Sequence, residues 1–217
     1  MNLKTFLLDL FFPPRCTFCH TIVENGEIRV CEHCEKNLPF TSNCGKQRKD
    51  FVKACVSPFY YQDDVRASLL RFKFGNTPSY AEVYADYVAA CIQDSFTGQW
   101  DVLSWVPVSK KRLHQRGYDQ AELLCRAIAL KLGAEAIPLL VKKRHTKAQS
   151  ATGSAEKRRA NIAGAYAVVP GADVTDRRIL LIDDIITTGA TITECARTLG
   201  LAGADCVFCA TVARQRD

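Results

Sequence analysis

The residues best suited to chemistry form one short segment, LLIDDIITTGATIT, between Leu180 and Thr193. Two acids, Asp183 and Asp184, follow directly after an apolar run of the kind that forms a strand buried on both faces. Open α/β sheets bind their ligands at the C-terminal ends of strands, where these acids are expected to lie. Carboxylates at that position suit sugar hydroxyls or a bridging Mg²⁺.

The residues after the acids predict an anion-binding turn. They supply backbone N–H groups, hydroxyl donors and a glycine with no side-chain bulk, and a helix is predicted immediately after them. These residues are Thr187, Thr188, Gly189, Ala190 and Thr191. Such a turn suits a phosphate monoester, so a ribose 5-phosphate unit would satisfy the turn and the acids together. The alternative is a strand-to-helix turn that binds nothing.

The same segment closely resembles the phosphoribosyl-pyrophosphate (PRPP) motif of type I phosphoribosyltransferases. That motif consists of apolar residues, two acids and then T-T/S-G-x-T, and the matching residues are Asp183, Asp184, Thr187, Thr188, Gly189 and Thr191. No GK[ST] or GxGxxG motif is present, which excludes a Walker A loop and a dinucleotide fingerprint. The resemblance implies that the two acids are catalytic and that residues 187–191 bind PRPP with Mg²⁺.

Two CxxC units near the N-terminus predict a structural zinc site. Cys16 and Cys19 form the first unit, and Cys31 and Cys34 form the second. Four thiolates complete a tetrahedral zinc site and leave no position open for catalysis. Two disulfides or a coincidental spacing of cysteines are the alternatives, but the length of the chain and the clustering favour reduced thiols and metal. Cys44 and Cys55 have no CxxC partner, so they are assigned to no second site.

The positive charge of the chain is concentrated in one region. The formal net charge is +6, yet residues 110–159 hold thirteen Lys or Arg against four Asp or Glu, an excess of +9. The rest of the chain is therefore at −3. A basic region of this size favours a polyanionic ligand, and the alternative is a solvated helix surface.

The order of the elements predicts an α/β fold. From about residue 55, apolar strands alternate with helical patterns, which is typical of a mainly parallel sheet flanked by helices. Asp119 and Glu122 are spaced to cap a helix that ends at Gly133, and Ser79 and Glu82 are spaced as a second capping box. Residues 109–117 are expected to be a basic turn. Residues 142–164 are expected to be a long loop that acts as a lid.

The wider pattern resembles the ComF-type competence proteins and their GntX-like relatives. The shared features are the cysteine units, FKFG, the stretch VPVSKKRLHQRGYDQAELL with its RGYDQ signature, the loop with Arg158 and Asn161, and the PRPP motif. This resemblance implies a module over residues 1–50, which consists of an N-terminal packing helix and a zinc-binding segment, and a type I phosphoribosyltransferase domain over residues 51–217. It also implies a role in taking up single-stranded DNA during natural transformation.

The resemblance also implies two further groups of binding residues. A loop that binds the pyrophosphate of PRPP would contain Ser109, Lys110, Lys111 and Arg112. A mobile loop would bring Lys147, Arg158 or Arg159 to the leaving group. Arginine suits this role because its guanidinium makes bidentate contacts with phosphate.

Two functions remain open at this point. The first is a PRPP-dependent transferase with an unknown acceptor, acting in DNA uptake or nucleotide metabolism. The second is a non-catalytic PRPP sensor that handles single-stranded DNA with the DNA-uptake machinery, stacking bases on Tyr118, Trp100 or Trp105. No apolar run approaches the length of a membrane-spanning helix, so we expect a cytoplasmic protein without membrane insertion.

Overall fold

The computed structural model describes residues 13–23, 29–144 and 160–216. The packing helix expected at the N-terminus lies outside the described residues. Most of the expected lid, including Lys147, Arg158 and Arg159, lies outside them as well.

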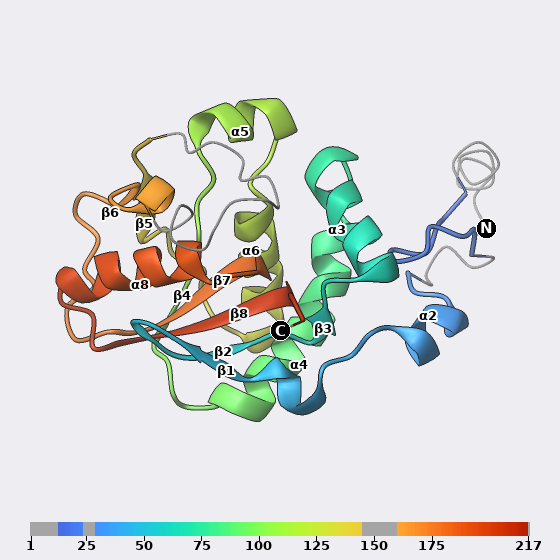
Figure 1. The fold of residues 1–217 in the computed structure, drawn as a ribbon, viewed down its shortest axis with the longest axis horizontal. Coiled ribbons are helices and arrows are strands. Elements are labelled where there is room, and N and C mark those ends of the chain that lie inside the picture. The colour runs from blue at the N-terminus through green and yellow to red at the C-terminus, as the bar shows by residue number, and fades with distance from the viewer. Residues whose placement is uncertain (1–12, 24–28, 145–159, 217) are drawn as a thin grey trace.

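A mostly parallel sheet forms the centre of the molecule, as the alternation of strands and helices predicts (Figure 1). Its strand order is β1-β2-β8-β7-β4, and β3 also pairs with β8. The strands are β1 (Gln47–Lys49), β2 (Val52–Val56), β3 (Phe59–Tyr60), β4 (Val102–Trp105), β7 (Arg178–Ile186) and β8 (Cys206–Arg214). Only the edge strand β1 is antiparallel to its neighbour among these pairs. A separate antiparallel pair consists of β5 (Leu140–Lys142) and β6 (Tyr166–Val168).

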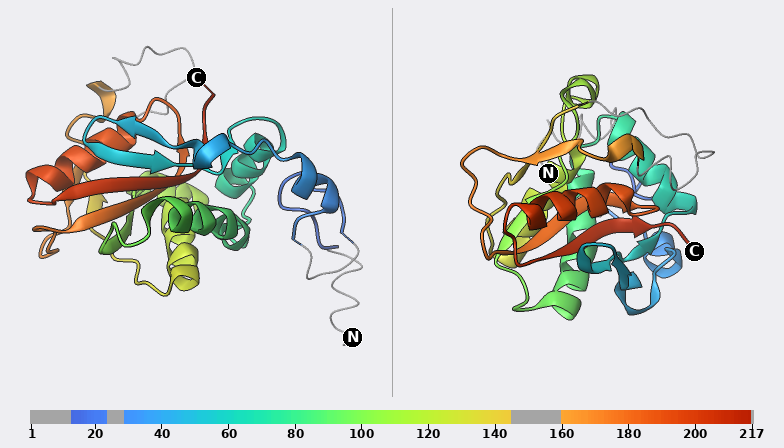
Figure 2. Two further views of the ribbon diagram at one scale, coloured as in Figure 1. Left: turned by 90° about the horizontal axis from the view of Figure 1, so that it is seen from below. Right: turned by 60° about the vertical axis from the view of Figure 1, so that its left-hand side comes forward.

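Helices cover both faces of this sheet, as expected for an open, mainly parallel α/β fold (Figure 2). One face packs against α3 (Asp63–Phe74), α4 (Tyr80–Phe96) and α6 (Gln120–Leu132). The other face packs against α8 (Ala190–Leu201). Alternate residues of a strand point to opposite faces, so Leu180 and Ile182 join the first core while Ile179 and Leu181 join the second.

The helix boundaries of α6 follow from its capping residues. Asp119 accepts hydrogen bonds from the backbone N–H groups of Ala121 and Glu122, and Gly133 ends the helix in the left-handed conformation at φ 64°. The sequence predicts both ends correctly. The Glu122 carboxylate does not complete the capping box, because it pairs with Arg126 instead.

Two local predictions are wrong. Residues 110–116 form a helix, α5 (Lys110–Arg116), and not a turn, because the Ser109 side chain caps its first turn. The Ser79 side chain makes no capping hydrogen bond to α4. Its expected partner Glu82 forms an ion pair with Arg29 instead, so no capping box is present there.

The cysteine-bearing segment packs against the helices of the main sheet. It contains α2 (Glu32–Asn37) and is followed by the 3-10 helix η1 (Ser42–Gly45). Phe18 is fully buried and contacts the rings of Phe59, Tyr84 and Tyr87 edge-on. This segment therefore shares one apolar core with α3 and α4. The domain boundary after residue 50 stays a prediction.

A cavity of about 520 Å³ lies at the opposite end of the sheet from the two acids. It is lined by Trp100 and Asp101 before β4 and by Arg177 before β7, at the N-terminal ends of these strands. None of the described helices is long and apolar enough to span a membrane.

Candidate functional site

The two acids lie inside strand β7, three and two residues before its last residue, Ile186. The strand continues through Ile186, whereas the sequence predicts an end at Asp184. Because successive side chains alternate, Asp184 points to the face of α3 and α6, and Asp183 points to the face of α8. The two carboxylates therefore have different neighbours.

Asp184 forms an ion pair with Lys73 in the last turn of α3. Lys73 Nζ lies 2.8 Å from Asp184 Oδ2, and both side chains are largely buried, with exposed fractions of 19% and 13%. The Arg116 guanidinium, at the end of α5, also interacts electrostatically with Asp184 and stacks on the ring of Phe74 at 5.0 Å. Two cations from different helices thus surround this carboxylate.

Asp183 has a less favourable environment for its charge. Burial and the adjacent Asp184 carboxylate raise the pKa of Asp183 to about 8, and the nearby Lys73 only partly offsets this. Asp183 Oδ1 accepts a hydrogen bond from the backbone N–H of Asp184 at 2.8 Å. An acid with this pKa is mostly protonated at neutral pH, so it can donate as well as accept hydrogen bonds.

The predicted anion-binding turn joins β7 directly to the N-terminus of α8. Gly189 is the N-cap residue with φ 81°, a conformation that residues with a side chain rarely adopt. No side chain caps the first turn of α8. Thr187 is exposed, and Thr188 and Thr191 are partly exposed. The first N–H groups of α8 are therefore left for a ligand or for water.

The residues expected to bind pyrophosphate begin helix α5. Ser109 is buried and its hydroxyl accepts a hydrogen bond from the backbone N–H of Arg112. Lys110 and Lys111 are exposed, and Arg112 interacts electrostatically with Arg116. Since Arg116 also interacts with Asp184, α5 carries its positive charge toward the acid pair. Whether these residues bind pyrophosphate stays a prediction.

The RGYDQ signature fixes the position of α5 through partly buried hydrogen bonds. Asp119 Oδ2 accepts from the backbone N–H of Val108 at 2.8 Å, which holds the segment after β4 against the start of α6. Gln120 Oε1 accepts from Arg116 at 2.6 Å, and the Tyr118 hydroxyl donates to the backbone carbonyl of Phe72 at 2.5 Å. The signature therefore links α5 and α6 to the end of α3, where Lys73 lies.

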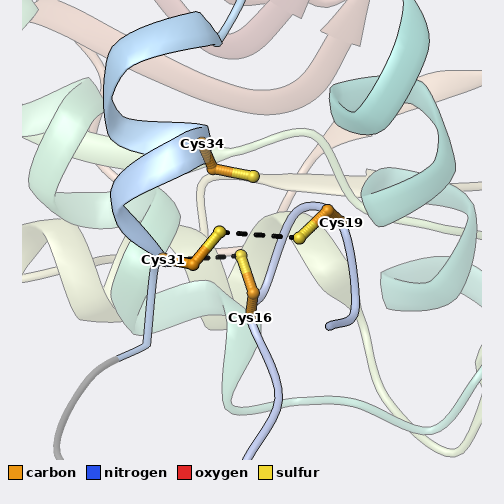
Figure 3. Close-up of side chains that lie close together, drawn as sticks. All are labelled: Cys16, Cys19, Cys31 and Cys34. Carbon is orange, nitrogen blue, oxygen red and sulfur yellow. Dashed lines mark hydrogen bonds between the residues drawn. The ribbon is translucent and has the colours of Figure 1, made fainter. Parts of the chain in front are cut away.

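The four cysteines of the CxxC units meet at one point (Figure 3). Their sulfur atoms all lie within 4.8 Å of one another, and those of Cys19 and Cys31 are 3.6 Å apart. A tetrahedral zinc ion with Zn–S bonds of about 2.3 Å holds its sulfurs about 3.8 Å apart, so this geometry fits the metal. The backbone N–H of Cys31 donates to Cys16 Sγ at 3.4 Å. His20 and His33 are not part of the cluster.

The remaining cysteines form no second metal cluster within the described residues. Cys55 is fully buried and lies opposite Cys209 on the adjacent strand. Cys44 is partly buried against the core, beside Cys91. Cys206 and Cys209 belong to opposite faces of the sheet, as their spacing on a strand predicts.

One residue of the site could not be anticipated from the patterns. Lys73 belongs to the FKFG segment, and nothing in its surroundings along the chain indicates a contact with Asp184. The contact depends on the packing of α3 over the end of β7, which is a property of the folded chain.

Two protein families match this chain, one over the segment that contains the acid pair and one over the segment that contains the four cysteines. Residues 119–217 match the phosphoribosyl transferase domain, and residues 7–56 match the double zinc ribbon domain. Competence protein F of Haemophilus influenzae is 28% identical over 90% of this chain and 94% of its own length. The chain belongs to the ComF-type competence family. The order of a zinc ribbon followed by a phosphoribosyltransferase domain is the decisive observation.

Other ComF-type relatives have similar identities. Competence protein ComFC of Streptococcus pneumoniae is 29% identical, over 87% of this chain and 82% of its own length. DNA utilization protein YhgH of Escherichia coli K12 is 30% identical, over 47% of this chain and 44% of its own length. Among solved structures, the allosteric regulatory enzyme of purine biosynthesis is 20% identical with a TM-score of 0.43, over 64% of this ComF-type chain and 29% of that chain.

Proposed function

We propose that this ComF-type protein binds PRPP at the end of β7 and uses it in a phosphoribosyl transfer connected with DNA uptake. The observation that carries the proposal is the direct passage from the acid pair, through Gly189, into the uncapped N-terminus of α8. In this arrangement the 5-phosphate lies on the N–H groups of α8, and Asp183 and Asp184 receive the ribose hydroxyls.

The acids by themselves are a poor fit for a preformed magnesium site. Asp184 is already paired with Lys73, and the raised pKa of Asp183 disfavours the charged form that a cation needs. Within the described residues, metal-ligating side chains cluster only at the four cysteines. Mg²⁺ would therefore be held mainly by the oxygens of the pyrophosphate group, where it neutralises the charge of the leaving group.

The contribution of the protein to transfer is then positional and electrostatic. Asp183 and Asp184 orient the ribose, and Lys110, Lys111 and Arg112 on α5 stabilise the pyrophosphate as its bond to the sugar breaks. Arg116 and Lys73 limit the repulsion between the acid pair and the anionic ligand. No acceptor is assigned to this reaction.

A second function, the handling of single-stranded DNA, is favoured by the composition of α5. Its seven residues include Lys110, Lys111, Arg112 and Arg116 and no acid. Relatives named for competence and for DNA utilization agree with a nucleic-acid ligand. The proposed stacking residues support it less, because Trp105 is buried under Arg126 and the Tyr118 hydroxyl is bonded to Phe72.

The proposal is tested by titrating the purified protein with PRPP in the presence and absence of Mg²⁺. A screen for pyrophosphate release over nucleobases and single-stranded oligonucleotides follows. Binding with release supports a transferase, and binding without release for any acceptor supports a PRPP sensor. A protein that does not bind PRPP contradicts both.

A further inference from the structure

A lysine from the edge of the sheet crosses the glycine that begins α8. Lys49 is the last residue of β1, the strand that follows the zinc-binding segment. A Cβ atom placed on Gly189 would lie 3.0 Å from Lys49 Cδ and 3.2 Å from Lys49 Cγ and Cε. The aliphatic part of Lys49 therefore packs directly over Gly189, in the turn that we propose holds a phosphate.

The ammonium group of Lys49 has no carboxylate partner among the described residues. Lys73 and Lys131, by contrast, form ion pairs with Asp184 and Asp86. Lys49 is only partly exposed, with its aliphatic stem packed against the turn at Gly189. The charge of Lys49 is therefore available to an anionic ligand that binds at this turn.

The helix end beneath Lys49 carries positive charge of its own. The N–H groups in the first turn of α8 have no side-chain cap, and the helix dipole places about half a positive charge there. Because the stem of Lys49 contacts the N-cap residue Gly189, a second positive charge belongs to this helix end. A phosphate monoester, with a charge near −2, would attract the Lys49 ammonium and accept hydrogen bonds from the first N–H groups of α8.

We propose that Lys49 is a ligand of the 5-phosphate in the PRPP site, so that a residue of the N-terminal part of the chain completes the phosphate cradle. This inference rests on the proposed function and adds to it a residue outside the PRPP motif. Lys49 contributes a charge-assisted hydrogen bond, while the N–H groups of α8 contribute neutral ones. Lys49 therefore discriminates sugars with a 5-phosphate from sugars without one.

Two features of the fold favour a glycine at position 189. The left-handed φ of Gly189 already favours glycine, and the stem of Lys49 occupies the space that a Cβ would need. The close approach of the two residues places the stem of Lys49 against the N-cap residue of α8.

The test uses Lys49→Met, which keeps an unbranched apolar stem over Gly189 and removes the charge. Lys53→Met is the matched control, because Lys53 is exposed on β2 and its ammonium lies over Phe208, which belongs to the core on the opposite face of the sheet. Ribose 5-phosphate and magnesium pyrophosphate are titrated into each protein by calorimetry. Lys49→Arg, which keeps the positive charge, is titrated in parallel.

We expect Lys49→Met to bind ribose 5-phosphate about ten- to a hundredfold more weakly than the wild type, in line with the loss of a charged hydrogen bond. Its affinity for magnesium pyrophosphate should be unchanged, and Lys49→Arg and Lys53→Met should bind both ligands normally. Equal binding of ribose 5-phosphate by Lys49→Met and the wild type would overturn the role of Lys49 and leave the proposed function standing. A parallel loss of both ligands would also overturn it, since a specific 5-phosphate contact cannot act on pyrophosphate. A wild-type protein that binds neither ribose 5-phosphate nor PRPP would overturn the proposed function itself.

Discussion

Lys73 and Asp184 join the end of α3 to the end of β7 through an ion pair of 2.8 Å between largely buried groups. This pair places a positive charge beside two adjacent carboxylates that would otherwise repel each other. It also connects the FKFG segment to the PRPP motif, although the two lie far apart along the chain.

Replacing Lys73 with Met should destabilise the protein noticeably. Removing one partner of a largely buried ion pair leaves the other charge uncompensated, which costs about 3–5 kcal/mol at a fully buried site and correspondingly less at a partly exposed one. Lys131→Met is the control, because its pair with Asp86 is more exposed and such pairs contribute about 0–1 kcal/mol. Chemical denaturation measures both. Equal losses in the two variants would contradict a special role for the Lys73 pair.

The pH dependence of stability should change when Asp183 is replaced with Asn. Since the folded protein holds the Asp183 proton more tightly than the unfolded chain does, this carboxyl favours the folded state most below pH 4, and its contribution is lost as the pH rises through about 8. Asp183→Asn removes this dependence, so the variant should gain stability relative to the wild type between pH 4 and pH 8.

Asp101→Asn serves as the comparison, because its effect on stability should not change between pH 4 and pH 8. Arg178 lowers the pKa of Asp101 to about 2, so its contribution to stability is present above pH 4 and is lost as the pH falls through 2. Melting temperatures measured from pH 4 to pH 8 decide the matter. If the difference in melting temperature between Asp183→Asn and the wild type does not change with pH, the pKa of Asp183 is not raised.

The local features of this fold could be predicted from sequence because their causes are local. The passage from β7 to α8 and both ends of α6 depend on residues next to one another, such as Asp119 and Gly133. Helix α5 was missed because it is short and shows no apolar period, so that its N-cap Ser109 was interpreted as part of a turn. The spacing of Ser79 and Glu82 wrongly predicted a capping box, because Glu82 forms an ion pair with Arg29, which is distant along the chain.

The long-range part of the candidate site could not be predicted in the same way. The positions of Lys73 and Lys49 depend on how α3 and β1 lie against the ends of β7 and α8, and no periodicity or motif encodes these contacts. The four cysteines are the exception, because their spacing alone specifies a tetrahedral site.

Zinc removal should lower the melting temperature of the whole protein, and not only loosen its N-terminal part. Cys16, Cys34 and Phe18 are buried in the core that also contains α3 and α4, so a disordered zinc site exposes that core. Elemental analysis should find about one zinc per chain in the wild type and in Cys44→Ser, and much less in Cys34→Ser. A chelator-treated protein that contains no zinc and melts like the wild type would rule out a structural role.

Single-stranded DNA should bind weakly, without sequence preference and with a steep dependence on salt. Replacing Lys110 and Lys111 with Glu should lower the affinity for all oligonucleotides by a similar factor and reduce the salt slope by about one unit per lysine. This pair is a better target than Lys142, whose ammonium is half-buried and donates to the Tyr166 hydroxyl. Fluorescence anisotropy at low salt is the measurement, with Lys36→Glu and Lys53→Glu together as the control. Equal losses in both double variants would indicate that only the net charge matters.

The most direct test of the PRPP site is calorimetry with PRPP and Mg²⁺ on the wild type and on the double variant Asp183→Asn, Asp184→Asn. We expect saturable binding to the wild type and none to the double variant, because Asp184 loses its charge and each amide offers the ribose hydroxyls one acceptor oxygen and an NH2 donor in place of a carboxyl group. A melting curve confirms that the variant remains folded. Normal binding of PRPP by a folded double variant would mean that the acids are structural, and would contradict the site proposed at the end of β7.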